Sequence, residues 1–199
     1  MTQRESACMA SRVSALASHM HKGHFGVDGQ TGVTLAEVPD LTLIQIAAWP
    51  DSLTAVGEVA AQSAQCSAAP GPGQATEGGA TASLLRIEPL KWWLVASGTT
   101  NPIPDLNADQ GAMLDLSHSR THLRITGEHA KTLLNRHLPL DLREHAFPVS
   151  SVASTAFHHV GITLWRSSQG YELFLPRGFA VSLWEGLLES AEQFGVDVV

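Results

Sequence analysis

Three short apolar segments follow one another near the end of the chain, and the turns between them are too short to hold a helix. The segments are residues 152–157, 162–166 and 171–175, separated at Gly161 and by the polar turn 167–170. Strands joined by such turns pair antiparallel, because a parallel pair needs a crossover of roughly a dozen residues. Residues 179–194 then carry apolar side chains at spacings of three and four, which predicts an amphipathic helix ending at Gly195.

The rest of the chain mixes strands and helices in the same irregular way. We predict strands at 41–49, 84–88, 92–96, 112–116 and 122–126, and helices at 53–66 and 128–137. Strict alternation of strand and helix is absent, so the predicted class is α+β, with mostly antiparallel sheets and helices packed on one face. Two strand–helix–strand halves in succession suggest an internal duplication.

Two segments lie outside the predicted core. Residues 7–20 have the composition of a short helix, but glycines recur closely between residues 23 and 32, which prevents a helix there. We therefore predict a flexible arm at 1–35 and a single domain at 36–199. Residues 67–82 are a low-complexity run of Ala, Gly and Pro, predicted to be a disordered surface insertion.

Composition narrows the choice of partners. The 199 residues include 19 acidic and 12 basic side chains, with a net charge of −7, which argues against nucleic acid or an anionic membrane surface as the partner. No apolar run approaches the roughly 20 residues that span a bilayer, and we recognise no signal peptide. Cys8 and Cys66 form no CxxC pair, so a reducing cytoplasm is expected. Only 16% of residues are charged, which indicates that part of the surface meets another protein.

Three histidines near the beginning of the chain could ligate a metal. They are His19, His21 and His24 in the sequence HMHKGH. Their spacing matches neither a helical HxxxH pair nor a zinc finger, and no acid or cysteine with ligand spacing accompanies them. A solvated arm is the preferred interpretation, and we predict no metal-binding residue.

The sequence DLSHSRTH contains the residue types of a hydrolase triad, namely Asp115, Ser117, His118 and His122. Triad members usually come from distant parts of a chain, and adjacent residues of a strand point to opposite faces. No GxSxG elbow or glycine-rich nucleotide loop is present either. We favour a turn held by Ser and His hydrogen bonds, and predict no catalytic or cofactor-binding residue.

The C-terminal half adds a resemblance that no single motif would carry. The stretches DLSHSRTHLRITGEHAKTLLNRHLPLDLREHAFPV (115–149) and GYELFLPRGFAVSLWEGLLESAEQFG (170–195) resemble the gamma subunit of heterotetrameric sarcosine oxidase. That family is similar in turn to the folate-binding domain of the glycine-cleavage T-protein. The resemblance extends more weakly to LTLIQIAAWP (41–50), LRIEPLKWWLV (85–95) and SALA (14–17). The insertion at 67–82 and the His-rich arm depart from the family pattern.

The resemblance implies a T-protein-like fold and a non-catalytic structural role beside alpha, beta and delta subunits. Such a complex oxidatively demethylates sarcosine to glycine, with tetrahydrofolate accepting the one-carbon unit. It implies that FAD, FMN, NAD, zinc and tetrahydrofolate belong to other subunits, with no cofactor on this chain. Two alternatives stay open: a stand-alone folate-binding one-carbon transferase, and a small subunit of a related N-methyl amine oxidase. Leu16, Trp92 and Trp93 are the predicted interface residues, because one face of the 92–93 strand should meet a partner.

Overall fold

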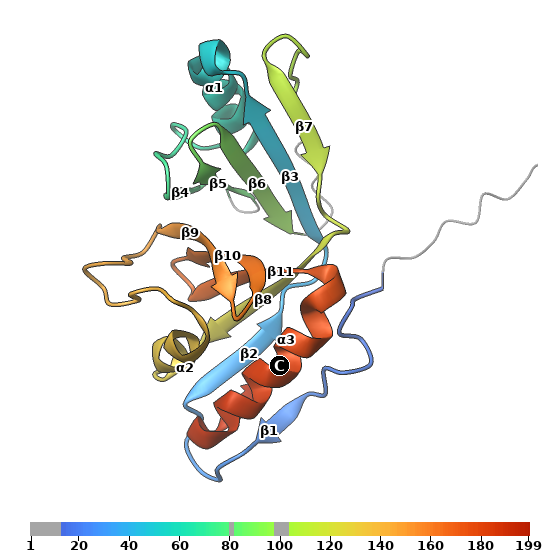
Figure 1. The fold of residues 1–199 in the computed structure, drawn as a ribbon, viewed down its shortest axis with the longest axis vertical. Coiled ribbons are helices and arrows are strands. Elements are labelled where there is room, and N and C mark those ends of the chain that lie inside the picture. The colour runs from blue at the N-terminus through green and yellow to red at the C-terminus, as the bar shows by residue number, and fades with distance from the viewer. Residues whose placement is uncertain (1–12, 80–81, 98–103) are drawn as a thin grey trace, which may run out of the picture.

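Two β-sheets face each other, and helices cover their outer sides (Figure 1). The structure is a computed structural model, and it describes residues 13–79, 82–97 and 104–199. All neighbouring strands are antiparallel except β12 and β2, which are parallel. The predicted α+β class with mostly antiparallel sheets is confirmed.

The strands divide into a sheet of seven and a sheet of five. The larger sheet has the spatial order β1 (Gly23–Phe25), β12 (Val196–Val198), β2 (Val33–Glu37), β8 (Arg120–Thr126), β11 (Tyr171–Pro176), β10 (Val160–Arg166) and β9 (Val152–Phe157). The smaller sheet has the order β4 (Ala75–Glu77), β5 (Ala82–Glu88), β6 (Lys91–Ser97), β3 (Leu41–Ala48) and β7 (Gly111–Asp115). The helices are α1 (Leu53–Ser63), α2 (Ala130–His137) and α3 (Ala180–Ala191), with single 3-10 turns η1 (Pro50–Ser52), η2 (Arg177–Phe179) and η3 (Glu192–Phe194).

The two halves of the chain share one topology. In the first half β3 leads through α1 into β4, β5 and β6, and β6 returns to pair with β3. In the second half β8 leads through α2 into β9, β10 and β11, and β11 returns to pair with β8. The strand before each unit joins the other sheet, since β2 pairs with β8 and β7 pairs with β3. The two-half organisation predicted from the sequence is therefore present as a repeated unit in which the strand preceding each unit pairs with the other unit.

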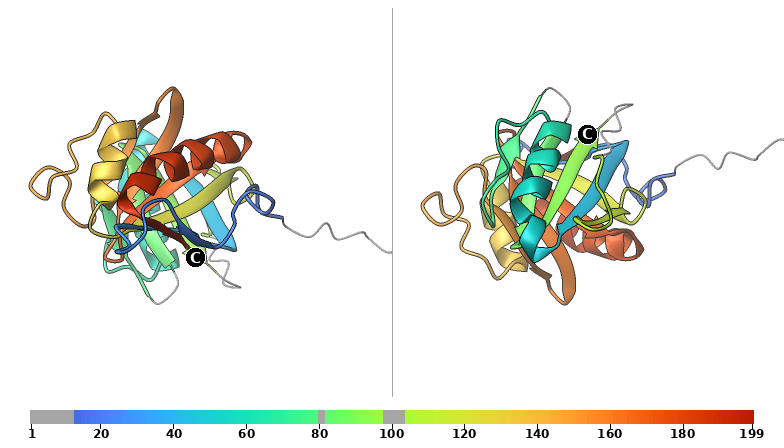
Figure 2. Two further views of the ribbon diagram at one scale, coloured as in Figure 1. Left: turned by 90° about the horizontal axis from the view of Figure 1, so that it is seen from below. Right: turned by 90° about the horizontal axis from the view of Figure 1, so that it is seen from above.

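Three apolar clusters hold these layers together. One lies between α1 and the five-stranded sheet and includes Ile46 and Trp92. A second lies between the seven-stranded sheet and the pair α2 and α3, and it includes Leu173. The third fills the space between the sheets with Trp93 and Phe174. Figure 2 shows α2 and α3 on one end of the molecule and α1 on the other.

Trp92 and Trp93 do point to opposite faces of β6, but neither faces a partner. Trp92 lies under α1 and Trp93 lies against the second sheet, with 1% and 4% of their surfaces exposed. The alternation of the strand predicts the two directions. The expectation that one face meets another protein was wrong, because the seven-stranded sheet of the same chain covers it.

The predicted arm at 1–35 is also wrong where the structure describes it. Leu16 is fully buried in the cluster of the larger sheet, so it is not available as an interface residue. β1 pairs with β12, and β2 crosses the predicted boundary at residue 35. Residues 15–19 form a turn rather than the end of a helix. Gly26 has a φ of 82° and passes so close to the backbone of Glu192 that a Cβ atom would overlap it. This glycine serves close approach rather than flexibility.

The predicted insertion at 67–82 is built into the sheet architecture. It contains β4, with Ala75 buried, and its backbone bonds to the other sheet. Val152 donates its N–H to the carbonyl of Gly73 at 2.8 Å, and Ala75 donates to the carbonyl of Ser150 at 2.7 Å. Small residues allow this approach, so the low-complexity composition did not indicate disorder here. Residues 80–81 lie outside the described residues.

The other predicted elements are present, with ends shifted by a few residues. The strands missed by the sequence prediction are β1, β2, β4 and β12, all five residues or shorter. No helix in the described part of the chain is long and apolar enough to cross a membrane.

Replacing Leu16 with alanine tests whether the N-terminal segment belongs to the core. We expect Leu16→Ala to lower the free energy of unfolding by about 2–5 kcal/mol, since it removes buried methyl groups and leaves a cavity. Urea denaturation measures the change. Val13→Ala, at an exposed side chain of the same segment, is the matched control and should have little effect. Equal stability of the two variants would show that the segment does not pack as described.

Candidate functional site

A carboxylate is buried near the start of β11. Glu172 is 0% exposed, and it lines a cleft of about 270 Å³ at the margin of the two sheets. Its neighbours Tyr171 and Leu173 point to the α2 and α3 side, so Glu172 and Phe174 point towards the smaller sheet. A buried charge is costly unless partners neutralise and hydrogen-bond it, so its surroundings define the site.

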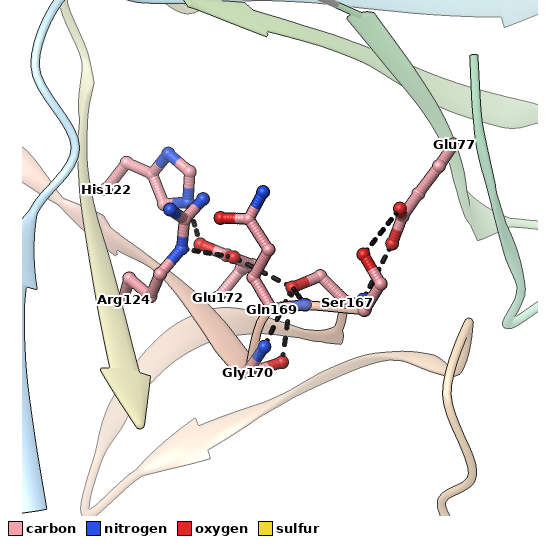
Figure 3. Close-up of polar contacts among 8 residues, drawn as sticks. Glu77, His122, Arg124, Ser167, Gln169, Gly170 and Glu172 are labelled. Carbon is pink, nitrogen blue, oxygen red and sulfur yellow. Dashed lines mark hydrogen bonds and ion pairs between the residues drawn. The ribbon is translucent and has the colours of Figure 1, made fainter. Parts of the chain in front are cut away.

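Three side chains bind the two oxygens of Glu172 (Figure 3). His122 Nε2 lies 2.7 Å from Oε2, while Arg124 Nε donates to Oε1 at 2.7 Å and Ser167 Oγ donates to the same oxygen at 2.9 Å. His122 and Arg124 lie two residues apart on β8, opposite Phe174 and Glu172 of β11, so all four side chains lie on the same face of the sheet. The ring of His122 also stacks on Phe174, with centroids 4.4 Å apart.

The electrostatics favour an ionised carboxylate. Burial by itself raises the pKa of Glu172, but the hydrogen bond and charge of His122, followed by those of Arg124, outweigh it and hold the pKa below its ordinary value. The carboxylate is therefore charged at neutral pH and balanced by a cation. Arg124 is the member of the group that is partly exposed, so it is the one that a molecule in the cleft could reach.

A second carboxylate joins the sheets across the same cleft. Glu77, at the end of β4, accepts hydrogen bonds from the backbone N–H of Ser168 at 2.7 Å and from its hydroxyl at 2.8 Å. The neighbouring Ser167 Oγ accepts the N–H groups of Gln169 and Gly170, both at 3.1 Å. The turn between β10 and β11 is thus fixed from the smaller sheet and from within, and Figure 3 shows Glu77 on the far side of the cleft from Arg124.

This arrangement is suited to holding elements in place rather than to moving a proton. Each oxygen of Glu172 already accepts a hydrogen bond, and His122 is buried between Glu172 and Phe174. A general base needs access to the proton that it removes. Within residues 13–79, 82–97 and 104–199, no group of three His, Cys, Asp or Glu side chains is placed to hold a metal ion.

The structure separates the residues that resembled a triad. Ser117 is buried and its Oγ accepts the N–H of Leu43 at 3.0 Å, while its own N–H donates to Asp115 Oδ1 at 2.8 Å. His122 is bound to Glu172 instead, and His118 is exposed. The preferred interpretation as a turn therefore describes Asp115 and Ser117, but not the two histidines.

The three N-terminal histidines do not converge either. His24 Nδ1 lies 2.7 Å from Asp197 Oδ1, and Nε2 lies 3.0 Å from the carbonyl of Val27. The hydrogen bond with Asp197, and then that with Val27, raises the pKa of His24. His24 therefore ties β1 to β12, while His19 and His21 stay exposed.

Sequence reasoning missed Arg124, Ser167 and Glu172. The signal for Glu172 was present, because a charged residue within the otherwise apolar run YELFL must find a partner if the strand is buried. Its partners could not be found in the same way. They depend on the pairing of Glu172 with Arg124 across β11 and β8, which lie far apart in the sequence.

Comparison with known proteins connects this fold to one kind of subunit. No protein-family model matches the sequence. The sarcosine oxidase subunit gamma of Corynebacterium sp. (strain U-96) is 27% identical over 173 residues, which cover 84% of this chain and 83% of the relative. The chain is a homologue of sarcosine oxidase gamma subunits. The gamma subunits of Corynebacterium sp. (strain P-1) and an Arthrobacter species are 30% and 32% identical, over 47% and 37% of this chain and 47% and 36% of the relatives.

Solved structures agree on the fold. A chain of the heterotetrameric sarcosine oxidase from Corynebacterium sp. U-96 superposes with a TM-score of 0.75 at 23% identity, covering 92% of this chain and 96% of the other. Aminomethyltransferase T of the glycine cleavage system from Bartonella henselae gives 0.59 at 18% identity, covering 85% of this chain and 48% of the other. The predicted T-protein-like fold is confirmed.

Neutralising Glu172 should destabilise the domain and make its free energy of unfolding depend less on pH in the acidic range. Because the pKa of Glu172 is lower in the folded chain than its ordinary value of 4.5, its stabilisation is complete above that value and is lost as the pH falls through the folded pKa. Glu172→Gln leaves the buried partners of Glu172 without a carboxylate, which should lower the free energy of unfolding by about 3–5 kcal/mol at pH 7. Urea denaturation between pH 7 and pH 3 measures both effects.

Glu77→Gln is the matched control, since it makes the same change at an exposed carboxylate of the same cleft. It should cost less and should leave most of the acid sensitivity in place. If Glu172→Gln loses stability on acidification as steeply as the unmodified chain, other carboxylates are responsible.

Proposed function

We propose that this chain is the gamma subunit of a heterotetrameric sarcosine oxidase complex, which oxidatively demethylates sarcosine to glycine with tetrahydrofolate as the one-carbon acceptor. The observation that carries the proposal is the similarity to a sarcosine oxidase gamma subunit along 83% of that relative's length. The similarity is not confined to a motif, since the same fold extends over 92% of this chain. The partners are alpha, beta and delta subunits in the cytoplasm.

The role of the chain in the complex is structural. The carboxylates of its cleft are hydrogen-bonded within the chain: three side chains bind Glu172, and Ser168 binds Glu77. In the proposed complex, the other subunits hold FAD, FMN, NAD, zinc and tetrahydrofolate. A rigid subunit can contribute to the reaction by holding a neighbouring domain in place, so that the one-carbon unit reaches its acceptor before it escapes.

Co-expression with candidate alpha, beta and delta subunits tests the proposal. We expect a tag on this chain to recover the other subunits in a fixed ratio, and the complex to oxidise sarcosine. Other N-methyl amines, offered to the same complex, distinguish a sarcosine oxidase from a related N-methyl amine oxidase. A chain that purifies as a stable monomer in the presence of all three subunits would contradict the proposed role.

A stand-alone folate-binding one-carbon transferase is the second candidate. It is favoured by the shared fold with aminomethyltransferase T and by the cleft in which Arg124 is partly exposed. Calorimetric titration of the isolated chain with tetrahydrofolate separates the two. The structural role predicts no saturation in the micromolar range. Micromolar binding that Arg124→Ala weakens would favour the transferase, since the guanidinium is the exposed cation of the cleft.

A further inference from the structure

A groove of about 820 Å³ runs beside α1, on the outer side of the smaller sheet and away from the cleft of Glu172. Every residue that lines it belongs to the described part of the chain. The lining combines small apolar residues of α1 and of the segment after it with two large side chains of the sheet: Gly57, Ala61, Ala69, Arg86 and Trp92. Pockets of this size with mostly apolar walls and a few polar groups commonly hold small molecules.

The ring N–H of Trp92 is buried at this groove without an acceptor among the described residues. Trp92 is 1% exposed, and its Cζ2 atom, two bonds from Nε1, would lie 3.6 Å from a Cβ atom at Gly57. The N–H side of the ring therefore faces α1. An indole N–H is a donor only, and burying it unpaired costs free energy. Trp165 and Trp184 also lack an acceptor, so the N–H of Trp92 points to a ligand only together with its neighbour Arg86.

Arg86 brings an unbalanced positive charge to the same place. Its guanidinium carbon lies 4.9 Å from the centre of the Trp92 ring, and its Nε is buried without an acceptor. The two terminal nitrogens donate to the backbone carbonyls of Pro70 and Pro89. Among the described residues, Arg86 forms no ion pair. A guanidinium is always charged, so this half-buried cation favours an anion beside it.

The other charges near the groove limit that anion to one negative charge. Glu58 is the second charged side chain in the lining, and it is exposed on α1. Glu88 and Lys91, at the turn after β5, are bound to each other at 2.8 Å. One carboxylate therefore opposes the single cation of the lining. A phosphate or a dicarboxylate would meet more repulsion from Glu58 than a monocarboxylate does.

We propose that this groove binds a small monocarboxylic acid. The carboxylate accepts hydrogen bonds from Arg86 Nε and Trp92 Nε1, which supplies the acceptor and the counter-charge that the chain lacks there. The apolar part of the acid lies against the small residues of α1 and against Ala69. The inference goes beyond the proposed function and does not depend on it, because α1, β5, β6 and residues 66–69 form the groove within this chain.

Titration of the full-length chain with pentanoate tests the site. We expect saturable binding by calorimetry, and in nitrogen-15 NMR spectra we expect the ring N–H signal of Trp92 to move downfield as it gains a charged acceptor. The chain has five tryptophans, and Trp92→Phe assigns the signal. Pentanamide has nearly the same shape but no charge, so it should bind at least roughly tenfold more weakly.

Variants of the two charged residues separate this site from others. Arg86→Gln should weaken pentanoate binding at least roughly tenfold, since it removes the cation. Glu58→Gln should tighten pentanoate binding a few-fold and leave pentanamide unchanged, because it removes the opposing charge. Arg136→Gln is the matched control, at another arginine over an aromatic ring but away from the groove, and should bind like the unmodified chain. Thermal melts followed by circular dichroism check that each variant is folded.

Three outcomes overturn the inference. If pentanoate binds but neither Arg86→Gln nor the Trp92 signal responds, the acid binds elsewhere. If pentanamide binds as tightly as pentanoate, the groove accepts apolar molecules without reading a carboxylate. If pentanoate shows no saturable binding, the two N–H groups have no carboxylate ligand. Should Arg86→Gln fail to fold, the amide comparison and Glu58→Gln still decide, and none of these results bears on the co-expression test of the proposed function.

Discussion

The contact of Phe174 with both sheets is the interaction on which the rest of the structure depends. Its ring meets Trp93 of the smaller sheet edge-on, with centroids 5.8 Å apart, and stacks on His122 of the neighbouring strand. Aromatic pairs in these geometries add to the apolar area that they bury. Because Glu172 lies two residues away on the same face of β11, the contact that joins the sheets also sets the dry surroundings of the carboxylate.

Through this coupling, the polar groups of the cleft hold the two sheets together. The ion pairs of Glu172 join β11 to β8 within the larger sheet, and Glu77 joins that sheet to the smaller one. Buried ion pairs contribute little net stability compared with apolar packing, but breaking one is expensive. The arrangement therefore disfavours alternative positions of the sheets, which suits a subunit whose proposed task is to hold a neighbour in place.

The sequence predicted the longer elements well because their periodicity is local. The alternation of β6 indicates two directions for Trp92 and Trp93, and the spacing of apolar residues defines α3. What the sequence could not show is what covers each face. Leu16 and the glycines after it look like an arm in isolation, and only the buried cluster of the larger sheet and the pairing of β1 with β12 make them part of a core. Strands of three residues, such as β4, are too short for any period to be recognised.

The candidate site was less predictable for the same reason. His122 was noticed as a possible catalytic residue, but its partner comes from β11 through strand pairing rather than from the nearby Asp115. The charge of Glu172 within an apolar strand was a signal that the sequence analysis did not use, while Arg124 and Ser167 carried no signal of their own. The resemblance to gamma subunits supplied the functional context that spacing could not supply.

The exchange of β2 and β7 between the two repeats governs how the chain can be made. β2 is synthesised early, but its partner β8 follows only after the whole first repeat. Thr34 therefore cannot pair with Thr126 until most of the first repeat has been made. Conversely, β3 keeps an open edge until β7 has been translated. Neither repeat can complete its own sheet, although each has a full set of central strands. The molecule should accordingly fold as one late, cooperative unit, since distant pairings must form before the layers can close.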